Sequence, residues 1–395
     1  MKKILIYIFV LFILSSCMKN PEYKSYTAEL KIDFGDDVPS EYQEGAKVVL
    51  NNLNKSYSVE ALTTPEGIVN FTGVEPGFYS ATITHSFSAN GCNVYINGLK
   101  NLDIFSSIID TIPIVVSKTN AFIIKEYYYS GCLTPAGKQY LSDQYIEIYN
   151  NSETTQYVDG LSIVEHESYG IGENYWTFLP DDIVVKMIWT IPGNGEEHPV
   201  GPGQSIILAR DAINHKDDPN GNPLCPVNLG DADFEFYVYT ASNADIDSPT
   251  SPNLIEDLFT FRGTDVCFHV KGGSAIALVS IPGGTNEEER KEFINNNLIA
   301  KNNSGGSSTR YYCKIPVDNV LDAVEVVFDE PHAIYKRLPI ELDAGYTYNE
   351  FGARSAKCLR RKVKEVIDGR TVYQDTNNSS EDFFKGVEPK PKIYE

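Results

Sequence analysis

The sequence predicts a mainly β protein, and three observations support that prediction. Tyr is abundant and Met is scarce among the 395 residues, with 25 and 3 copies, and strands favour Tyr, Val, Ile and Thr. Gly and Pro turns interrupt short apolar runs at intervals of about 8–12 residues, which is typical of β-sandwiches. Residues 26–34 alternate between apolar and polar side chains, as a half-buried strand does.

The first 16 residues predict an export signal. Two lysines precede an apolar run that ends at Leu14, and this run is about half of the ~20 residues that a membrane-spanning helix needs. The run closes in Leu-Ser-Ser-Cys at 14–17, which resembles the lipobox of bacterial lipoproteins. That resemblance implies cleavage before Cys17 and lipidation of Cys17, palmitate included. It places the chain on the outer membrane of a Gram-negative cell, on either face, with a tether over 17–24.

Charge narrows the list of partners. The chain carries 54 acidic and 33 basic side chains, for a formal charge of −21. A field of this sign repels nucleic acid and anionic lipid surfaces. Nucleic acid is therefore not an expected partner, whereas cations and basic partners are compatible with the chain.

Six cysteines follow Cys17, and an even number in an exported protein permits up to three disulfides. They are Cys92, Cys132, Cys225, Cys267, Cys313 and Cys358. Their spacing leaves the pairing open, and buried thiols are the alternative. No Cys-x-x-Cys occurs, which argues against thiol redox chemistry and a zinc ribbon.

Residues 25–119 are expected to form the first sandwich. A Gly-Ala-x-Val-x-Leu segment at 45–50 precedes a turn at 63–67, and residues 71–79 read Phe-Thr-Gly-Val-Glu-Pro-Gly-Phe-Tyr. These segments resemble the carboxypeptidase-regulatory-like, or transthyretin-like, sandwich. The resemblance implies a spacer or docking unit without catalytic residues.

Residues 120–395 are expected to form a larger second domain. Five segments occur in a fixed order: Tyr-Ile-Glu-Ile-Tyr-Asn at 145–150, Asp-Gly-Leu at 159–161, Pro-Gly-Gln-Ser-Ile-Ile-Leu at 202–208, Leu-Arg-Arg at 359–361, and Asp-Thr-Asn-Asn-Ser-Ser-Glu-Asp-Phe at 375–383. They resemble the lamin-tail immunoglobulin-like domain, which implies a β-sandwich. Such a sandwich needs about 100 residues, so insertions are expected at about 165–198 and 211–355. The second insertion is expected to be partly helical, because Thr285 and Glu288 form a capping box ahead of a helix to about Ala300.

The whole arrangement is similar to an uncharacterised family of bacterial cell-envelope lipoproteins. Related lipoproteins are often encoded with TonB-dependent outer-membrane transporters. The resemblance therefore implies, by analogy, an accessory to such a transporter.

Three aromatic residues, Tyr175, Trp176 and Trp189, are the candidate ligand contacts. Trp176 comes first, because it follows a Gly-rich polar turn. Exposed rings can stack on sugars or aromatic chelators. The alternative is that these rings fill the core or its rim.

A calcium site is a second candidate. Asp218, Asn220 and Asn222 stand at alternate positions, with Asp217 beside them, and hard oxygen ligands at this spacing can face one Ca²⁺. The EF-hand pattern is not met, because Pro223 stands where Gly is required. A solvated, turn-rich loop is the alternative. Further aspartates follow at Asp231, Asp233, Asp245 and Asp247.

Catalytic signatures are mostly absent from the sequence. It contains no Gly-x-Ser-x-Gly elbow and no P-loop. His166-Glu167 begins like a zinc-protease motif, but Gly170 stands where the second His must be. We therefore expect a noncatalytic binding or assembly module whose loops carry recognition. A metal-dependent hydrolase that uses the insertion loops and a structural spacer are the alternatives.

Overall fold

The computed structural model describes residues 24–35, 38–89, 92–118, 121–167, 171–217, 221–240, 245–260, 264–302 and 309–394. The expected signal peptide, Cys17 and the tether up to residue 23 lie outside these ranges. No helix within them is long and apolar enough to cross a membrane. Strands dominate the chain, which confirms the predicted mainly β class.

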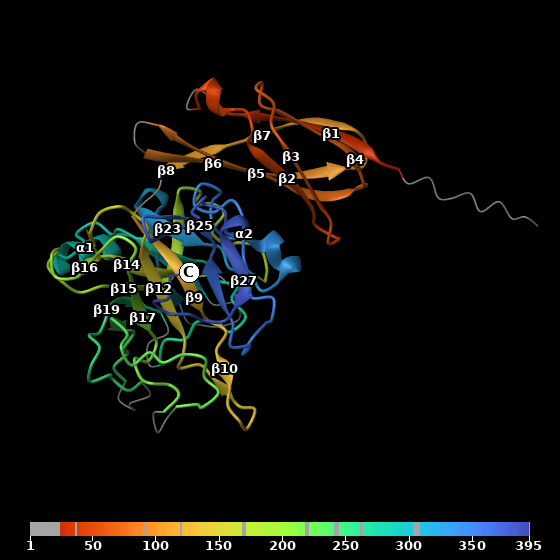
Figure 1. Ribbon diagram of the computed structural model, residues 1–395. Coiled ribbons are helices and arrows are strands. Elements are labelled where there is room, and N and C mark those ends of the chain that lie inside the picture. The colour runs from red at the N-terminus through yellow and green to blue at the C-terminus, as the bar shows by residue number, and fades with distance from the viewer. Residues whose placement is uncertain are drawn as a thin grey trace, which may run out of the picture.

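Residues 26–118 form two sheets that face each other across one core (Figure 1). The three-stranded sheet has the order β4-β1-β7, and the five-stranded sheet has the order β3-β2-β5-β6-β8. The elements are β1 Tyr26–Asp33, η1 Ser40–Tyr42, β2 Lys47–Asn52, β3 Ser58–Leu62, β4 Ile68–Val74, β5 Gly77–Ala89, β6 Cys92–Ile104, β7 Ile108–Pro113 and β8 Val115–Lys118. β1 pairs antiparallel with β4 and parallel with β7.

Buried and exposed side chains alternate along strand β1, so one face of its sheet lies in the core. Ala28, Leu30 and Ile32 are buried, whereas Lys31 between them is exposed. This pattern confirms the strand expected at 26–34. Burial of Leu30 and of Ile32 contributes about 1.5–3 kcal/mol each. The neighbouring strands β4 and β7 add Val69, Phe71 and Ile112 to the same core, and the facing sheet adds Val48, Leu50, Tyr79, Ile83 and Ile96.

The rest of the chain forms a second, larger sandwich (Figure 1). Its six-stranded sheet has the order β18-β17-β12-β9-β24-β27, with β9 Phe122–Tyr128, β12 Tyr145–Asn150, β17 Ser205–Ala209, β18 Phe234–Glu235, β24 Cys358–Arg361 and β27 Phe383–Val387. Its seven-stranded sheet has the order β21-β22-β15-β14-β20-β23, with β19 paired to β15. These strands are β14 Ser162–His166, β15 Asp182–Thr190, β19 Ile255–Phe259, β20 Ile276–Val279, β21 Leu298–Asn302, β22 Thr309–Pro316 and β23 Val320–Val324.

Short elements connect these strands. Three two-stranded ribbons pair β10 Cys132–Leu133 with β11 Gln139–Tyr140, β13 Gln156–Tyr157 with β16 Pro199–Val200, and β25 Val363–Ile367 with β26 Arg370–Tyr373. The helical elements are α1 Glu287–Asn296, η2 Val317–Asn319, η3 Glu330–Tyr335 and α2 Ser379–Asp382.

The two large sheets share one core. Ile124 and Ile146 from the six-stranded sheet and Ile163 and Ile276 from the seven-stranded sheet belong to the same buried cluster. The segments expected as insertions supply β15 and β19 to β23, so they build most of the seven-stranded sheet. They are integral to the sandwich, because without them the six-stranded sheet would have no apolar face to pack against.

The helix expected in the second insertion is present but shorter than predicted. Its N-cap is Asn286, whose side chain accepts from the backbone N–H groups of Glu288 and Glu289, so the capping residue lies one position after Thr285. The helix ends at Asn296 rather than near Ala300. The following residues leave the helix because β21 pairs with β22, and that pairing overrides local helix propensity.

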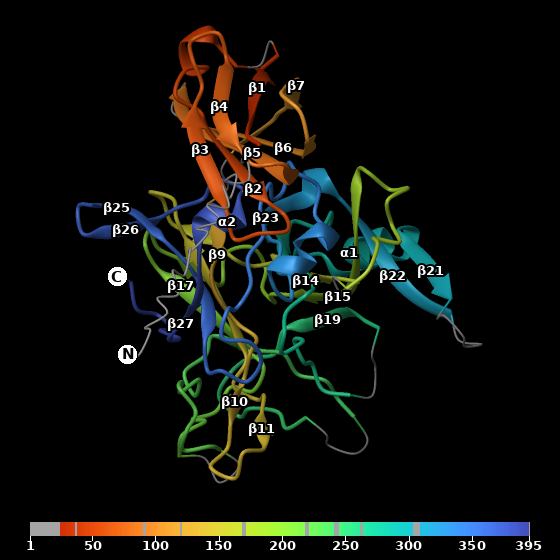
Figure 2. The same cartoon turned by 90° about the vertical axis from the view of Figure 1, so that its right-hand side faces the viewer.

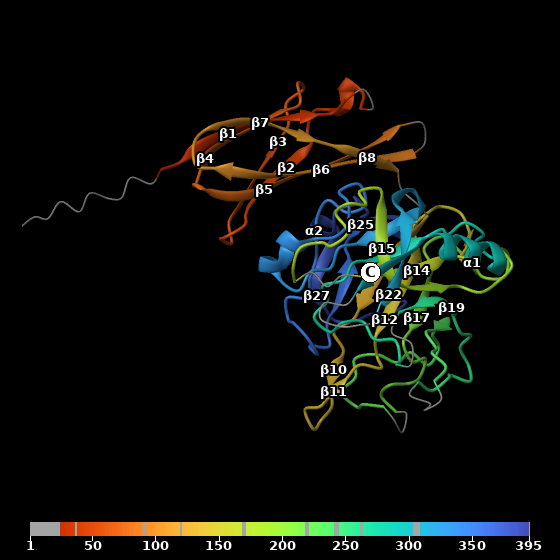
Figure 3. The same ribbon diagram turned by 180° about the vertical axis from the view of Figure 1, so that it is seen from behind.

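The segment at 376–382, which includes α2, contacts the five-stranded sheet of the first sandwich (Figure 2, Figure 3). Asn378 Nδ2 donates to Thr84 Oγ1 at 2.8 Å, and Asn97 Nδ2 donates to the carbonyl of Thr376. Lys47 Nζ lies 2.7 Å from Glu381 Oε2. These contacts join the two sandwiches through side chains, and not through a shared sheet.

Arg361 at the end of β24 forms a buried network of ion pairs beside the same segment. Its side chain is 2% exposed and lies 2.6 Å from Asp322, 3.1 Å from Asp375 and 3.3 Å from Asp382. Its Nε donates to the carbonyl of Ile124 at 2.9 Å. The three carboxylates raise the pKa of Arg361, although burial alone would lower it. The guanidinium therefore stays charged in the interior.

Candidate binding pocket

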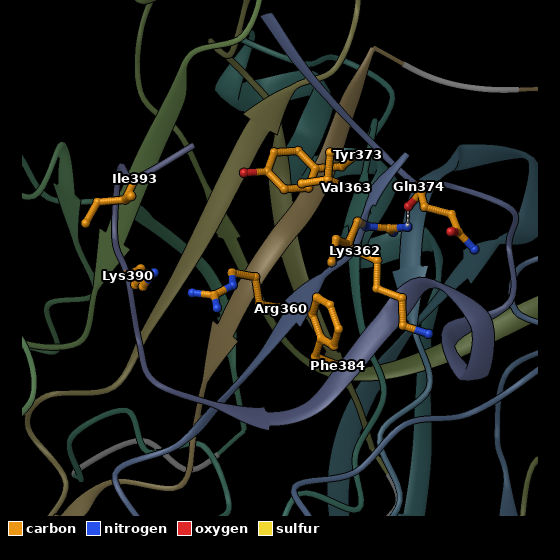
Figure 4. A pocket seen from close by; sticks show the side chains of 9 residues that line it. Arg360, Lys362, Val363, Tyr373, Gln374, Phe384, Lys390 and Ile393 are labelled. Atoms are coloured by element: carbon orange, nitrogen blue, oxygen red, sulfur yellow. Dashed lines mark hydrogen bonds between the residues drawn. The ribbon is translucent and has the colours of Figure 1, made fainter. Parts of the chain in front are cut away.

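A pocket of ≈ 440 Å³ opens beside β24, between β27, the β25–β26 ribbon and the C-terminal segment (Figure 4). Its most distinctive lining groups are the cations of Arg360, Lys362 and Lys390. Apolar surface comes from Phe384, Val363, Tyr373 and Ile393, and the rest from Arg361 and Gln374. The pocket therefore combines positive charge with aromatic and aliphatic walls.

The pleat of β24 separates the functions of two adjacent arginines. Successive side chains of a strand point to opposite faces, so Arg361 is buried in its carboxylate network whereas Arg360 is half-buried and lines the pocket. The chain then leaves the sheet at Lys362, whose backbone N–H donates to the carbonyl of Asp382 at 2.7 Å. This turn brings the Lys362 side chain to the same pocket.

Neighbouring groups fix the position of the lining cations. Arg360 Nη1 donates to the carbonyl of Glu388 at 3.1 Å and lies 3.5 Å from Glu126 Oε2. Lys362 Nζ donates to the carbonyl of Glu381 at 2.7 Å. A guanidinium has five donors and an ammonium has three, so these contacts leave both groups able to bind an anion. The backbone N–H of Lys390 donates to Glu126 Oε1 at 2.9 Å, which holds the C-terminal segment against the pocket.

The aromatic walls add apolar contact. Phe384 is 46% exposed, and its ring stands between Arg360 and Lys362 in Figure 4. Lys362 Nζ lies 5.9 Å from the centroid of that ring. Tyr373 is buried, and burial raises the pKa of its phenol, so it lines the pocket as a neutral group. The pocket thus suits an anion that also has an apolar part.

Comparisons find a family to which this part of the chain is similar. Residues 201–390 match the family model described as "Protein of unknown function (DUF4876)". A crystal structure of a DUF4876 family protein from Bacteroides thetaiotaomicron is 27% identical to the chain, with a TM-score of 0.59. That similarity covers 92% of this chain and 96% of the other. No curated protein shows a significant match.

The sequence did not single out this pocket. Arg360, Arg361 and Lys362 are three consecutive cations in a strongly acidic chain, and this run is the signal that could have drawn attention. It was interpreted only as one strand of the lamin-tail resemblance. Phe384 reaches the pocket from β27, and Lys390 reaches it from the segment after β27. Their contribution therefore depends on the pairing of β24 with β27.

The predicted aromatic contacts do not form one exposed group. Tyr175 is 53% exposed, whereas Trp176 is 3% exposed and its Nε1 donates to Glu167 Oε2 at 2.8 Å. The Trp176 ring packs against the Tyr175 ring, with ring centroids 4.7 Å apart. Lys301 Nζ lies 4.6 Å from the Tyr175 centroid. Trp176 is therefore a packing residue, and Tyr175 is the surface residue of the pair.

Trp189 is a correction to the sequence-based prediction. It lies on β15 with 0% exposure, in the core between the two large sheets. Its ring packs against Phe236 and Phe259, with centroids 5.6 and 6.0 Å apart. It is a core residue, because its side of β15 faces the six-stranded sheet.

The predicted calcium ligands are only partly described. Asp218 and Asn220 lie outside the described residues. Asp217 is exposed, and its Oδ2 accepts from Asn214 Nδ2 at 3.0 Å. Asn222 is buried instead, and its Nδ2 donates to the carbonyl of Leu133 at 3.1 Å. Its Oδ1 accepts from the backbone N–H of Leu224, so the Asn222 side chain holds the fold of this loop.

The cysteines whose side chains are described are free thiols, namely Cys132, Cys225, Cys267, Cys313 and Cys358. Cys225 Sγ donates to Asp143 Oδ2 at 3.3 Å, in a buried group that also contains Cys132. The hydrogen bond to Cys132 and burial raise the pKa of Cys225. Cys132, Cys225, Cys313 and Cys358 are buried and Cys267 is exposed, and the predicted disulfides are not formed among these five residues.

His166 ends strand β14 and is not part of a helix, in agreement with the argument against a zinc-protease motif. Burial and the neighbouring cations Arg337, Lys186 and Lys301 lower its pKa to about 3. An unfolded His titrates near pH 6.5. The unfolded state therefore binds more protons below that pH, so His166 makes the folded protein less stable as the pH falls.

Replacing His166 with Gln should remove this dependence. Between about pH 6.5 and pH 4.5 the unmodified protein should lose roughly 2–3 kcal/mol more free energy of unfolding than His166→Gln does. Urea denaturation of both proteins at several pH values measures the difference, in which the contributions of other groups cancel. Equal pH slopes for the two proteins would contradict the prediction.

Proposed function

We propose that this chain is a noncatalytic binding protein of the outer membrane, and that it captures a small organic anion in the pocket at Arg360. The observation that supports the proposal is a cluster of positive charges in a chain whose net charge is negative. Arg360, Lys362 and Lys390 line one pocket in a chain whose formal charge is −21. Cations gathered against the overall field favour an anionic ligand, and Phe384 offers its apolar part a surface.

The location belongs to the same proposal. Lipidation of Cys17 would hold the domain at the membrane, since each buried CH₂ of an acyl chain contributes about 0.8 kcal/mol. A TonB-dependent transporter is the partner that the lipoprotein resemblance suggests. Mass spectrometry of the protein from membranes tests the anchor: an unmodified Cys17 in a chain that retains its first residue would contradict it.

The pocket can be tested with defined anions. We expect at least one of benzoate, hexanoate and phenyl phosphate, which combine an anionic group with an apolar part, to raise the melting temperature of the full chain. The shift should shrink as NaCl is raised, because salt screens exposed charges. Each charge-assisted hydrogen bond contributes about 1.5–3 kcal/mol, so Arg360→Gln with Lys362→Gln should weaken binding by roughly tenfold or more.

Lys364→Gln is the matched control, because Lys364 lies two residues from Lys362 on the exposed strand β25 and does not line the pocket. It removes one positive charge from the same surface and should leave anion affinity unchanged. The proposal is wrong if none of the three anions binds, or if Lys364→Gln weakens binding as much as the pocket variant does.

A further inference from the structure

Three carboxylates converge at the end of the second sandwich that lies opposite the first sandwich. Asp211 follows β17, Asp245 lies in the loop after β18, and Asp265 follows β19. One oxygen of each lies within 4.8 Å of the others. Figure 2 shows long irregular loops after β17 and β18 in this region. The group is thus assembled from three separate segments of the chain.

Two of these carboxylates have an oxygen that no described residue satisfies. Asp245 is 4% exposed, and its Oδ2 accepts from the backbone N–H of Val238 at 2.7 Å, whereas its Oδ1 is buried and has no hydrogen-bond partner among the described residues. Asp265 Oδ2 accepts from Arg210 Nε at 2.9 Å, and its Oδ1 is also buried without a partner. A buried acceptor without a donor is unfavourable and calls for an explanation.

The charges around the group are not balanced. Burial, which outweighs the coulombic effect of nearby groups, raises the pKa of Asp245 to about 7 and that of Asp265 to about 6. Arg210 forms an ion pair with Asp265. Burial also raises the pKa of Glu235, which accepts from the backbone N–H groups of Ala212 and Ser248 in the adjoining loops. A cation among these oxygens would relieve both the repulsion and the unsatisfied acceptors.

We propose that Asp211, Asp245 and Asp265 bind one Ca²⁺ ion. All three ligands are hard oxygens, which suit Ca²⁺, Mg²⁺ and Mn²⁺ and not thiophilic metals. Two oxygens on opposite sides of Ca²⁺, at about 2.3–2.6 Å each, are separated by about twice that distance, and the three carboxylates lie within that reach. Mg²⁺ demands shorter, near-octahedral coordination, which irregular loops supply less readily. The ion would link three loops that lie mostly outside the hydrogen-bonded strands.

The proposal moves the calcium site away from the loop at 217–222. The sequence makes that loop a candidate because its possible ligands alternate along the chain, whereas Asp211, Asp245 and Asp265 are dispersed in sequence and meet only in the fold. Asp217 and Asp245 therefore provide a matched pair of substitutions that separates the two candidate sites.

Calorimetric titration of the full chain with CaCl₂, after dialysis against a chelator, tests the proposal. We expect one Ca²⁺ per chain and a melting temperature that rises with CaCl₂ more than with equal MgCl₂. Asp245→Asn should weaken Ca²⁺ affinity by at least about tenfold, since Asn keeps an acceptor for Val238 but removes the charge. Asp217→Asn should bind as the unmodified chain does.

Asp211→Asn is the second variant, in case Asp245→Asn folds poorly, and circular dichroism without metal reports folding for both. The proposal is overturned if the unmodified chain binds no Ca²⁺ at millimolar concentration. It is also overturned if folded Asp245→Asn and Asp211→Asn bind Ca²⁺ normally, or if only Asp217→Asn loses binding.

Discussion

Arg361→Met should lower the free energy of unfolding by about 3–5 kcal/mol, which is typical when one partner of a buried ion network is removed. The substitution would leave Asp322, Asp375 and Asp382 buried without the guanidinium that they share. It would also remove the hydrogen bond to the carbonyl of Ile124. Guanidinium chloride denaturation measures the loss.

The same variant should regain stability as the pH falls. Burial raises the pKa of Asp322 to about 6 and that of Asp382 to about 7 even with Arg361 present, and loss of the cation would raise both further. Acids with raised pKa values bind more protons in the folded state, so stability increases as the pH falls from about 7 toward 4. The defect should therefore be smaller near pH 5 than near pH 8.

Arg354→Met is the control for Arg361→Met. Arg354 is exposed, and its guanidinium contacts only the Gln139 side chain among the described residues, with Nη2 to Oε1 at 2.9 Å. Loss of that contact should change the free energy of unfolding by less than about 1 kcal/mol. A similar loss in both variants, or no pH dependence of the Arg361→Met defect, would contradict the prediction.

Trp189→Ala should also destabilise the protein by about 3–5 kcal/mol, because it opens a cavity in a close-packed core. The ring is fully buried between the two large sheets and contacts Phe236 and Phe259. Thermal and chemical denaturation measure the loss. A change of less than about 1 kcal/mol would show that Trp189 is not part of the packed core.

Two further variants check the physical reason. Trp189→Phe keeps most of the apolar volume and removes an indole N–H that is buried without a partner among the described residues, so it should cost much less than Trp189→Ala. Tyr175→Ala removes an aromatic ring that is half exposed, and it should cost about 0.5 kcal/mol or less. The three variants together separate core rings from surface rings.

Local periodicity was enough to predict several elements. The alternation at 26–34 depends only on which residues are apolar, and β1 follows it closely. The helix near 287 was also predictable, since its capping signals lie within a few residues of one another, although Asn286 caps it in place of Thr285. Errors arose at boundaries, where pairing between β21 and β22 ended the helix early.

The candidate sites were less predictable, because each depends on groups that meet across the fold. Trp176 is the first candidate and Trp189 another in the sequence, yet both are buried. The cations of the pocket come from both sides of the β24–β27 pair. Two of these cations belong to the run Arg360-Arg361-Lys362. The sequence of that run does not say which side chain points into the core.

The sequence by itself determined the β class, the strand at 26–34, the helix near 287 and the acidic character of the chain. Only the tertiary structure decided that β1 pairs in parallel with β7, that the expected insertions build a core sheet, and that Arg360 and Arg361 have opposite environments. It also decided that Asp211, Asp245 and Asp265 converge. The physical reason is the distance along the chain over which each effect acts. Periodicity and capping act between near neighbours, whereas burial and charge clustering depend on contacts between residues far apart in the chain.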